Sequence, residues 1–448
     1  MTTVQTADRV ITEPAKGSTA ERRSVGGASF GFFVDMFDIY LPVIVLGPAL
    51  SFFLPDTVST DTKRMLIGLI FASTLVARPL GSVIFGMLGD KIGRKRATVY
   101  SMAGAGVATG LIALLPGYQS IGLWAVGLLI LLRFVDGVFL GGEYTGAVPL
   151  AMEHSRRSKR GRNAGIIALG FPSAGVFISA LTLLMLTISP AAGPTSAYAT
   201  WGWRVPFAIG ALMSVAFAVY YAVSVKESSA WKSTKTGRVN PLKELVAGRH
   251  RSTLLQVFLL MTGVWFASNA TVVILPTVIG DNARISSSQT TIVLIVAQAI
   301  LALSYPLAGS LSQRIGRRRF FTLCGWAAGL ICAPLFVLFA SGTVSGVLGA
   351  TVVVTALLLT GVTTFGAIGA YMSERFPVEI RSTGYGVGYS LALVIPSFYA
   401  FYQGWLEHVM PYKYTPAALL VIGAICLVVG ALWGPETKDV DIKATAVD

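Results

Sequence analysis

The stretch Gly86-Met-Leu-Gly-Asp-Lys-Ile-Gly-Arg-Lys-Arg96 separates two long apolar segments of the chain. It recurs without gaps as Gly309-Ser-Leu-Ser-Gln-Arg-Ile-Gly-Arg-Arg-Arg319, about half of the 448-residue chain later. A looser pair follows the two copies, because basic residues come after both Glu153 and Glu374. This internal repeat predicts two halves of similar structure, related by an axis along the membrane normal if the chain is a membrane protein.

The composition indicates a membrane protein. Hydrophobic residues make up 54% of the chain and charged residues only 12%, which is about half of the charged fraction usual in soluble proteins. Apolar stretches between the charged loops reach the ~20 residues that a helix needs to cross a bilayer. We therefore predict an all-α polytopic membrane protein with twelve transmembrane helices in two pseudo-symmetric six-helix bundles. The predicted spans are 28–53, 64–88, 97–116, 122–153, 163–189, 203–225, 253–279, 288–312, 320–341, 345–374, 382–408 and 415–434.

These spans divide the chain into a tail (1–27), an N-terminal bundle (28–225), a linker (226–252), a C-terminal bundle (253–434) and a second tail (435–448). Lys and Arg gather in the linker and in the loops that hold the repeat, whereas the loops at the opposite ends of the spans contain few. Under the positive-inside rule, both termini are then cytoplasmic and the chain lies in the inner (plasma) membrane. The net charge of +14 resides in these loops, so we expect a lipid bilayer as partner and no nucleic acid.

Several segments resemble a known family. The pattern Gly-x-x-x-Asp-Lys-x-Gly-Arg-Lys-Arg between the second and third spans is similar to the signature of the major facilitator superfamily. Its metabolite:proton symporter branch, related to the sugar porters, is resembled at 77–81, 141–143, 202–207, 374–377 and 435–438. The resemblance implies transport by alternating access, with a substrate among organic acids or zwitterionic osmolytes.

Six ionisable residues stand well inside the predicted spans, all in the first half: Asp35, Asp38, Arg78, Arg133, Asp136 and Glu143. An unpaired charge at that depth costs about 2.5–3.5 kcal/mol, so such residues are candidates for function. Helical spacing places the two acids of the first span on one face and the three charges of the fourth span on one stripe. The alternative is a satisfied network that only ties the spans together.

We predict that these acids and Arg133 form the proton-coupling site. Asp35 or Asp38 is expected to bind the proton, and Arg133 to pair with the deprotonated acid, as an acid and an arginine in the same spans are linked in the sugar porters that the chain resembles. Arg78 is then free to hold an anionic group of the substrate through a bidentate contact.

The second half has no charge deep in a span and offers polar and aromatic stripes instead. These stripes are expected to form the other wall of the substrate pocket, and the alternative is helix packing with each polar group satisfied locally. Beside Arg78 and Arg133, the predicted substrate-binding residues are Trp265, Phe266, Asn269, Gln298, Tyr371, Tyr385, Tyr389, Tyr399 and Gln403.

The repeated loop is expected to act as a cytoplasmic gate, although basic loops also orient helices without gating. Asp90 is expected to accept hydrogen bonds at the N-terminus of the span at 382–408, or to pair with an arginine, and Arg94 or Arg96 to meet Glu153. Gln313 stands where the first copy has Asp90, so we expect the stronger latch on the first half. The predicted gate residues are Gly86, Asp90, Gly93, Arg94, Arg96, Glu153, Arg317, Glu374 and Arg381.

These observations predict a monomeric secondary transporter that couples protons to the symport of a small organic anion, such as a dicarboxylate or an aromatic acid. The alternatives are a symporter or uniporter of a zwitterionic osmolyte or sugar-like solute, and a receptor on a transporter fold. No enzyme is predicted, because the three histidines lie at loop edges and no nucleophile or metal motif is present. Protons are the only coupling ion expected, with no cofactor.

Overall fold

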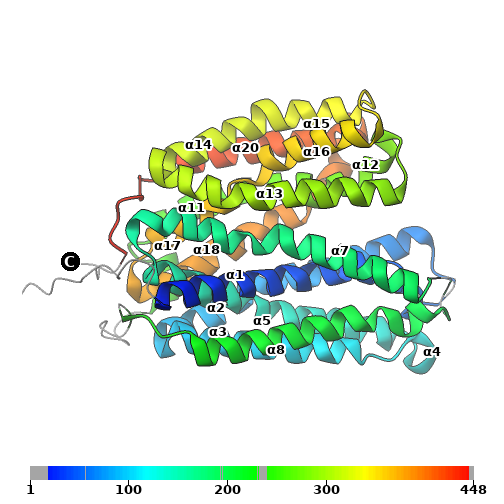
Figure 1. Ribbon diagram of the computed structural model, residues 1–448, viewed down its shortest axis with the longest axis horizontal. Helices are drawn as coiled ribbons and strands as arrows, with labels where there is room; N and C mark the ends of the chain where they lie inside the picture. Colours follow the sequence, from blue (N-terminus) through cyan, green and yellow to red (C-terminus); the bar gives the residue numbers. More distant parts are fainter. Residues whose placement is uncertain are drawn as a thin grey trace, which may run out of the picture.

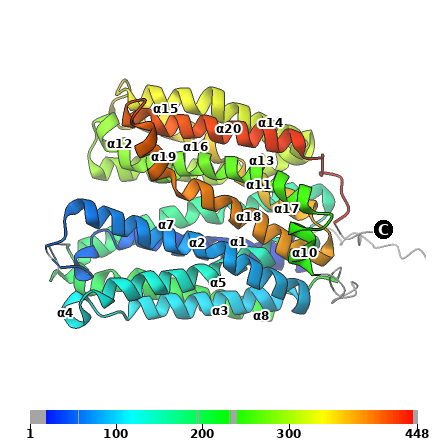
Figure 2. The same ribbon diagram turned by 180° about the vertical axis from the view of Figure 1, so that it is seen from behind.

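The computed structural model describes residues 19–442 except 56, 192, 194, 230 and 232–239. Helices dominate this part of the chain. They form two bundles that lie side by side with their long axes parallel (Figures 1 and 2). The predicted all-α architecture of two bundles is therefore confirmed.

The N-terminal bundle contains six spanning units. They are α1 (Thr19–Tyr40), α2 (Thr60–Ile92), α3 (Arg94–Ala113), α5 (Trp124–His154), α6 (Arg160–Ala168) with α7 (Gly170–Ile188), and α8 (Arg204–Ser224). A short α4 (Tyr118–Ile121) lies in the loop before α5, and α10 (Pro241–Val246) lies in the linker between the bundles.

The C-terminal bundle repeats this order with more interrupted helices. Its six units are α11 (Arg251–Ser268) with α12 (Leu275–Ala283), α13 (Ser287–Ile315), α14 (Arg317–Ala327) with α15 (Ala333–Ala340), α16 (Gly346–Val362) with α17 (Phe365–Arg375), α18 (Arg381–Ser397) with α19 (Tyr399–Leu406), and α20 (Thr415–Trp433). π-helical turns precede α12 and α15, and each of these helices has a proline in its first turn. Proline lacks an N–H, so the regular hydrogen-bond ladder is interrupted there.

Ten helical stretches of the described chain are long and apolar enough to cross a membrane. The other two predicted spans, 97–116 and 382–408, correspond to α3 and to α18 with α19. α3 opens on three consecutive basic residues, and α18 has only 17 residues before its break. Large apolar side chains such as Val223 (80% exposed) and Leu348 (79%) face outward, which is the arrangement expected against lipid.

The repeated loop has the same backbone geometry in both halves. Gly93 ends α2 with φ 107° and ψ 146°, and Gly316 ends α13 with φ 102° and ψ 149°. These angles suit glycine, which has no Cβ. A Cβ on either glycine would also meet a carboxylate, that of Glu227 or of Glu436 respectively.

Two predicted boundaries need correction. α1 begins at Thr19, inside the segment predicted as a tail at 1–27, and Glu21 and Ser24 are buried there. In the segment predicted as a tail at 435–448, the described residues reach Ile442, whose side chain is buried at 1% exposed. Hydropathy did not predict either boundary, because these residues are polar or follow a span. Packing against other parts of the chain holds them in place.

Small residues bring α2 and α5 into close contact. A Cβ on Gly137 or Gly141 would meet the backbone of Thr74 or Arg78 respectively, and one on Gly81 would meet the carbonyl of Val138. This approach places the middle of α2 beside α5, where the buried charges lie. The two bundles touch each other mainly through α2, α5, α6 and α7 on one side and α13, α17 and α18 on the other.

Candidate functional site

The structure brings five of the six deep charges together as two ion-paired groups. Arg78 on α2 donates through Nη2 to Asp35 on α1, and both side chains are fully buried. Arg133 on α5 pairs through Nη1 with Asp38 at 2.5 Å and with Asp136 at 3.1 Å. Two arginines thus face three of the four acids: the Asp35 and Asp38 pairs join α1 to α2 and α5, and the Asp136 pair lies within α5.

The Arg133 group is nearly saturated with partners. Thr109 donates to Asp38 Oδ2 at 2.6 Å, and Arg133 also donates from Nε to Thr74 Oγ1 and from Nη2 to the carbonyl of Asp38, each at 3.1 Å. A fixed, fully bonded arginine of this kind holds its acids in place. The predicted pairing of Arg133 with an acid of the first span is therefore present, with Asp38 as the acid.

The Arg78 group is not saturated. Arg78 is paired with Asp35, contrary to the expectation that it would be free. Yet Arg78 Nε and Nη1, and Asp35 Oδ2, have no hydrogen-bond partner among the described residues. Both carboxylate oxygens of Glu143 are likewise buried without a partner in that part of the chain. Donors and acceptors are therefore left over at one place.

Aromatic rings enclose Arg78 on the side of the C-terminal bundle. Its guanidinium lies 5.6 Å from the ring centre of Tyr144, whose hydroxyl hydrogen-bonds Ser390 across the bundle interface. The Tyr144 ring lies 4.7 Å from that of Tyr389, and Trp265 packs edge-on against Tyr389 at 5.2 Å. Tyr385 and Tyr389 also line a small cavity of about 20 Å³. The site at Arg78 is thus closed in this conformation.

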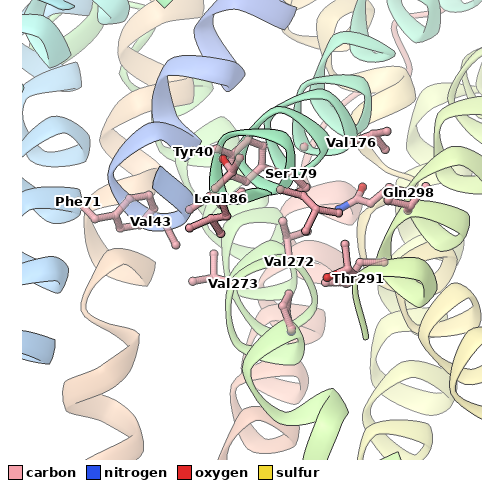
Figure 3. A pocket seen from close by; sticks show the side chains of 17 residues that line it. Tyr40, Val43, Phe71, Val176, Ser179, Leu186, Val272, Val273, Thr291 and Gln298 are labelled. Atoms are coloured by element: carbon pink, nitrogen blue, oxygen red, sulfur yellow. The ribbon is translucent and has the colours of Figure 1, made fainter. Parts of the chain in front are cut away.

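A larger cavity of about 400 Å³ lies between the bundles, toward the ends of the helices that are remote from the repeated loops. Tyr40 is the last residue of α1, and Gln298 lies in the first half of α13. Figure 3 shows these two side chains and Ser179 of α7 around the same space. Its lining consists of uncharged residues, mostly aliphatic: Tyr40, Val43, Ile44, Phe71, Gly175, Val176, Ser179, Thr182, Leu183, Leu186, Val272, Val273, Pro276, Thr291, Leu294, Ile295 and Gln298.

At the end with the repeated loops, the bundles are joined by two charge triads. In the first, Glu153 is bound by Arg94 (3.1 Å) of its own half and by Arg381 (2.5 Å) of the other half. In the second, Glu374 is bound by Arg317 (3.1 Å) of its own half and by Arg160 (3.2 Å) of the other half. All six side chains are buried. Each half therefore supplies one arginine to the triad of the other.

Asp90 makes a further contact between the bundles. Its carboxylate accepts hydrogen bonds from the backbone N–H groups of Ser382 (3.1 Å) and Thr383 (3.0 Å) and from the Thr383 hydroxyl (2.6 Å). These residues are in the first turn of α18, where N–H groups have no helical partner and the dipole favours an anion. The contact expected between Asp90 and the N-terminus of the eleventh span is present.

The segment after α20 crosses the same interface between the two bundles. Arg160 donates to the carbonyl of Val440 (3.0 Å), and Arg381 donates to the carbonyl of Ile442 (2.6 Å). Thr437 donates to Glu374 (2.7 Å). This segment therefore binds both of the arginines that the halves exchange.

Several predicted residues lie elsewhere. Among the predicted substrate-binding residues, Gln298 lines the larger cavity, while Trp265 and Asn269 donate to carbonyls of α18. Tyr371 bonds Gln256 near the end with the repeated loops, and Gln403 bonds Thr415. The remaining members outside both cavities are Phe266, which packs on Tyr402, and Tyr399 on α19. Of the predicted gate residues, Arg96 is exposed and Gly86 packs on the backbone of Thr383.

Sequence reasoning missed four residues that make contacts at these sites. Tyr40 lies on the face of α1 opposite to the two acids, so the periodicity of the acids did not point to it. Glu227 accepts from the N–H of Lys95 (3.0 Å), and Glu436 accepts from that of Arg317 (2.8 Å), so each caps the helix after a repeated loop. Trp231 donates to the carbonyl of Asp90 (3.0 Å). The equivalent placement of the two glutamates after the sixth and twelfth spans was the available signal.

Comparison with known proteins gives a consistent set of relatives. The sequence model of the Major Facilitator Superfamily matches residues 28–278 and 257–446. The inner membrane metabolite transport protein YhjE of Escherichia coli (strain K12) is 31% identical over 393 residues, covering 84% of this chain and 86% of that protein. The alpha-ketoglutarate permease of the same organism is 29% identical over 396 residues (87% and 89%), and its proline/betaine transporter is 27% identical over 435 residues (93% and 83%).

A solved structure shares the fold. The proton:xylose symporter XylE, bound to 6-bromo-6-deoxy-D-glucose, superposes with a TM-score of 0.74 at 17% identity, over 96% of this chain and 98% of that one.

Proposed function

Because this chain belongs to the Major Facilitator Superfamily, we propose that it is a proton-coupled symporter of a small organic carboxylate. Its family and its relatives make it a membrane-embedded transporter of a small molecule and not an enzyme. We propose in addition that the substrate is a carboxylate and that its transport is coupled to protons. We also propose that the protein lies in an inner membrane with both termini in the cytoplasm.

One observation supports a carboxylate as the substrate. Arg78 is fully buried, yet its Nε and Nη1 have no partner among the described residues, and the nearby hydroxyl of Tyr389 has none either. Nε and Nη1 lie on different edges of the guanidinium, and Nη2, which Asp35 now occupies, completes each edge. Release of Nη2 from Asp35 gives a fork that matches the two oxygens of a carboxylate, and such bidentate contacts are strong and directional. A relative named as an alpha-ketoglutarate permease supports the same substrate class.

The ion pair between Arg78 and Asp35 supports proton coupling. While Asp35 is ionised, it holds one edge of Arg78 and neutralises its charge. Protonation of Asp35 removes that negative charge, so the arginine attracts a substrate carboxylate in its place. Proton and anion then enter together as an overall neutral pair, which avoids the cost of carrying an uncompensated charge through the bilayer.

Glu143 fits the same scheme. An ionised carboxylate that is fully buried without a partner costs several kcal/mol, and both oxygens of Glu143 lack partners among the described residues. We propose that Glu143 carries a proton in this conformation. Asp38 and Asp136 remain paired with Arg133, which keeps the second group as a fixed structural partner.

The two charge triads and the Asp90 contact support an inward gate. We propose that they hold the cytoplasmic end closed here, while the 400 Å³ cavity serves the outward side. Transport requires these contacts to break as the outer side closes. Their position at the loops with most Lys and Arg supports this orientation.

Uptake into proteoliposomes tests the proposal. With an inside-alkaline pH gradient, short aliphatic and aromatic carboxylates are expected to accumulate and to compete with one another, whereas glycine betaine and xylose are not. Arg78→Lys keeps the charge but loses the fork, so it should raise the KM for the carboxylate at least about tenfold. Arg284→Lys, at an exposed position outside both cavities, is the matched control.

The second candidate is a symporter of a zwitterionic osmolyte. The uncharged lining of the larger cavity favours a solute without net charge, and one relative is named as a proline/betaine transporter. Accumulation of glycine betaine without competition by carboxylates would decide for this candidate and against the first.

A further inference from the structure

The larger cavity has unused hydrogen-bonding groups of its own. Tyr40 Oη, Thr182 Oγ1 and Gln298 Oε1 are buried atoms of lining residues, and none has a partner among the described residues. They come from α1, α7 and α13, so both bundles contribute. Thr182 is only 4% exposed. Buried polar atoms are nearly always satisfied in folded proteins, so a shared deficit around one space points to a ligand.

Two of the three residues, Tyr40 and Gln298, lie close to Gly175 of α7. A Cβ on Gly175 would come within 3.6 Å of the Tyr40 ring and 3.9 Å of Gln298 Nε2. Tyr40 and Gln298 therefore border the same volume from opposite bundles, as Figure 3 shows. The rest of the wall is mainly aliphatic, with Val43 and Val272 among its members. A polar centre in an apolar wall suits a small aliphatic solute with one polar substituent.

We propose that this cavity is an outer recognition site that reads an uncharged polar substituent, a hydroxyl or an oxo group, on the transported carboxylate. This inference rests on the proposed carboxylate function and names its substrate class as hydroxy- or oxo-carboxylates. The hydroxyls of Tyr40 and Thr182 donate or accept, and the amide of Gln298 offers both a donor and an acceptor. The lining has no cationic residue, so the carboxylate group is not held here.

The position of the cavity relative to Arg78 makes this a separate site. Tyr40 follows Asp35 by about one and a half helical turns on α1, or ~7.5 Å along its axis. Rings lie between, because Tyr40 packs on Phe171, Phe171 on Phe365, and Phe365 on Trp265. The solute therefore meets the uncharged site first and reaches Arg78 after this aromatic layer rearranges.

Matched competitors test the inference. We compare 2-hydroxybutyrate and 2-oxobutyrate with butyrate, which has the same skeleton without the substituent. A site built to hydrogen-bond a substituent rejects an analogue that lacks it; for a cavity open on one side we expect a preference of about tenfold to 100-fold in kcat/KM. Gln298→Leu, Tyr40→Phe and Thr182→Val should each reduce this ratio, and Gln298→Leu with Tyr40→Phe together should bring it to within about twofold.

Thr187→Val is the matched control for Thr182→Val, because Thr187 is an exposed residue of α7 outside the cavity that bonds the carbonyl of Leu184. It should keep the native ratio. A native ratio near one, or a ratio unchanged in the double variant, would overturn the inference while leaving carboxylate transport intact. Uptake of glycine betaine but of none of the three acids would instead overturn the proposed function. Native-like elution in gel filtration shows that each variant is folded.

Discussion

Replacing Asp90 by asparagine is expected to loosen the first turn of α18. Three donors converge on the native carboxylate, namely the N–H groups of Ser382 and Thr383 and the Thr383 hydroxyl, at 2.6–3.1 Å. Asparagine has one acceptor oxygen, so at least one buried N–H loses its partner and faces an amide NH₂ group instead. The neighbouring α2–α3 loop is otherwise unchanged.

The size of the effect follows from these contacts. An unsatisfied buried donor costs about 1–3 kcal/mol, and loss of an anion at a helix N-terminus about 0.3–1 kcal/mol. The closed conformation should therefore lose about 1.3–4 kcal/mol. At about 1.4 kcal/mol per factor of ten, the equilibrium between closed and open conformations shifts by about tenfold to 700-fold.

Hydrogen–deuterium exchange reports directly on the donors involved. In Asp90→Asn, amides in the first turn of α18 should exchange faster by a factor in this range, while amides in the middle of α5 keep their native protection. Lys91→Gln removes one charge from the exposed neighbouring position and should leave α18 unaffected. Native exchange at Ser382 and Thr383 in the Asp90 variant would refute the view that this carboxylate holds the two bundles together.

Other outcomes follow from the same structure. Arg133→Gln leaves two buried carboxylates without their cation, so it should destabilise the protein by about 3–5 kcal/mol; an unchanged melting temperature in detergent argues against this role. Asp35→Asn should abolish the increase of carboxylate accumulation at acidic external pH while substrate exchange persists, and a native pH profile would remove Asp35 from coupling. Gly81→Ala places a methyl group against a carbonyl of α5 and should lower the yield of folded protein, whereas Gly127→Ala, with open space around it, should not. Deleting residues 439–448 should speed trypsin cleavage at the end of the molecule that carries the repeated loops. Unchanged cleavage would show that this segment does not hold the two bundles together there.

The fold could be predicted from the sequence because helices that face lipid are long and apolar. Three features can be recognised directly in the sequence: the long apolar runs, the repeated loop and the uneven distribution of basic residues. Together they predict two six-helix bundles. The pairing of Glu153 with Arg94 was also accessible, since the repeat places both near the same end of the helices. The ends of the described chain were less accessible, because hydropathy does not reveal the burial of Glu21 and Ile442.

The sequence predicted which charged residues form the site, but not which of them pair with one another. Depth in a span identifies Asp35, Asp38, Arg78 and Arg133, yet the choice of partner depends on how α1 rotates between α2 and α5. Small residues such as Gly141 set that packing through backbone contacts, which no periodicity encodes. For the same reason, aromatic residues on the stripes of the second half could not be divided into cavity walls and packing contacts.

The exchange of arginines between the two triads has a consequence for the origin of the chain. Arg160 and Arg381 follow the glutamates of their own halves at the same spacing, but each binds the glutamate of the opposite half. Two identical six-helix subunits would satisfy one another by this same rule, because in a two-fold interface residue i meets j and j meets i. The chain thus retains, within one polypeptide, the contact pattern of a symmetric homodimer. A substitution at either glutamate therefore leaves an arginine of each half without its partner, so the two halves are bound to evolve together.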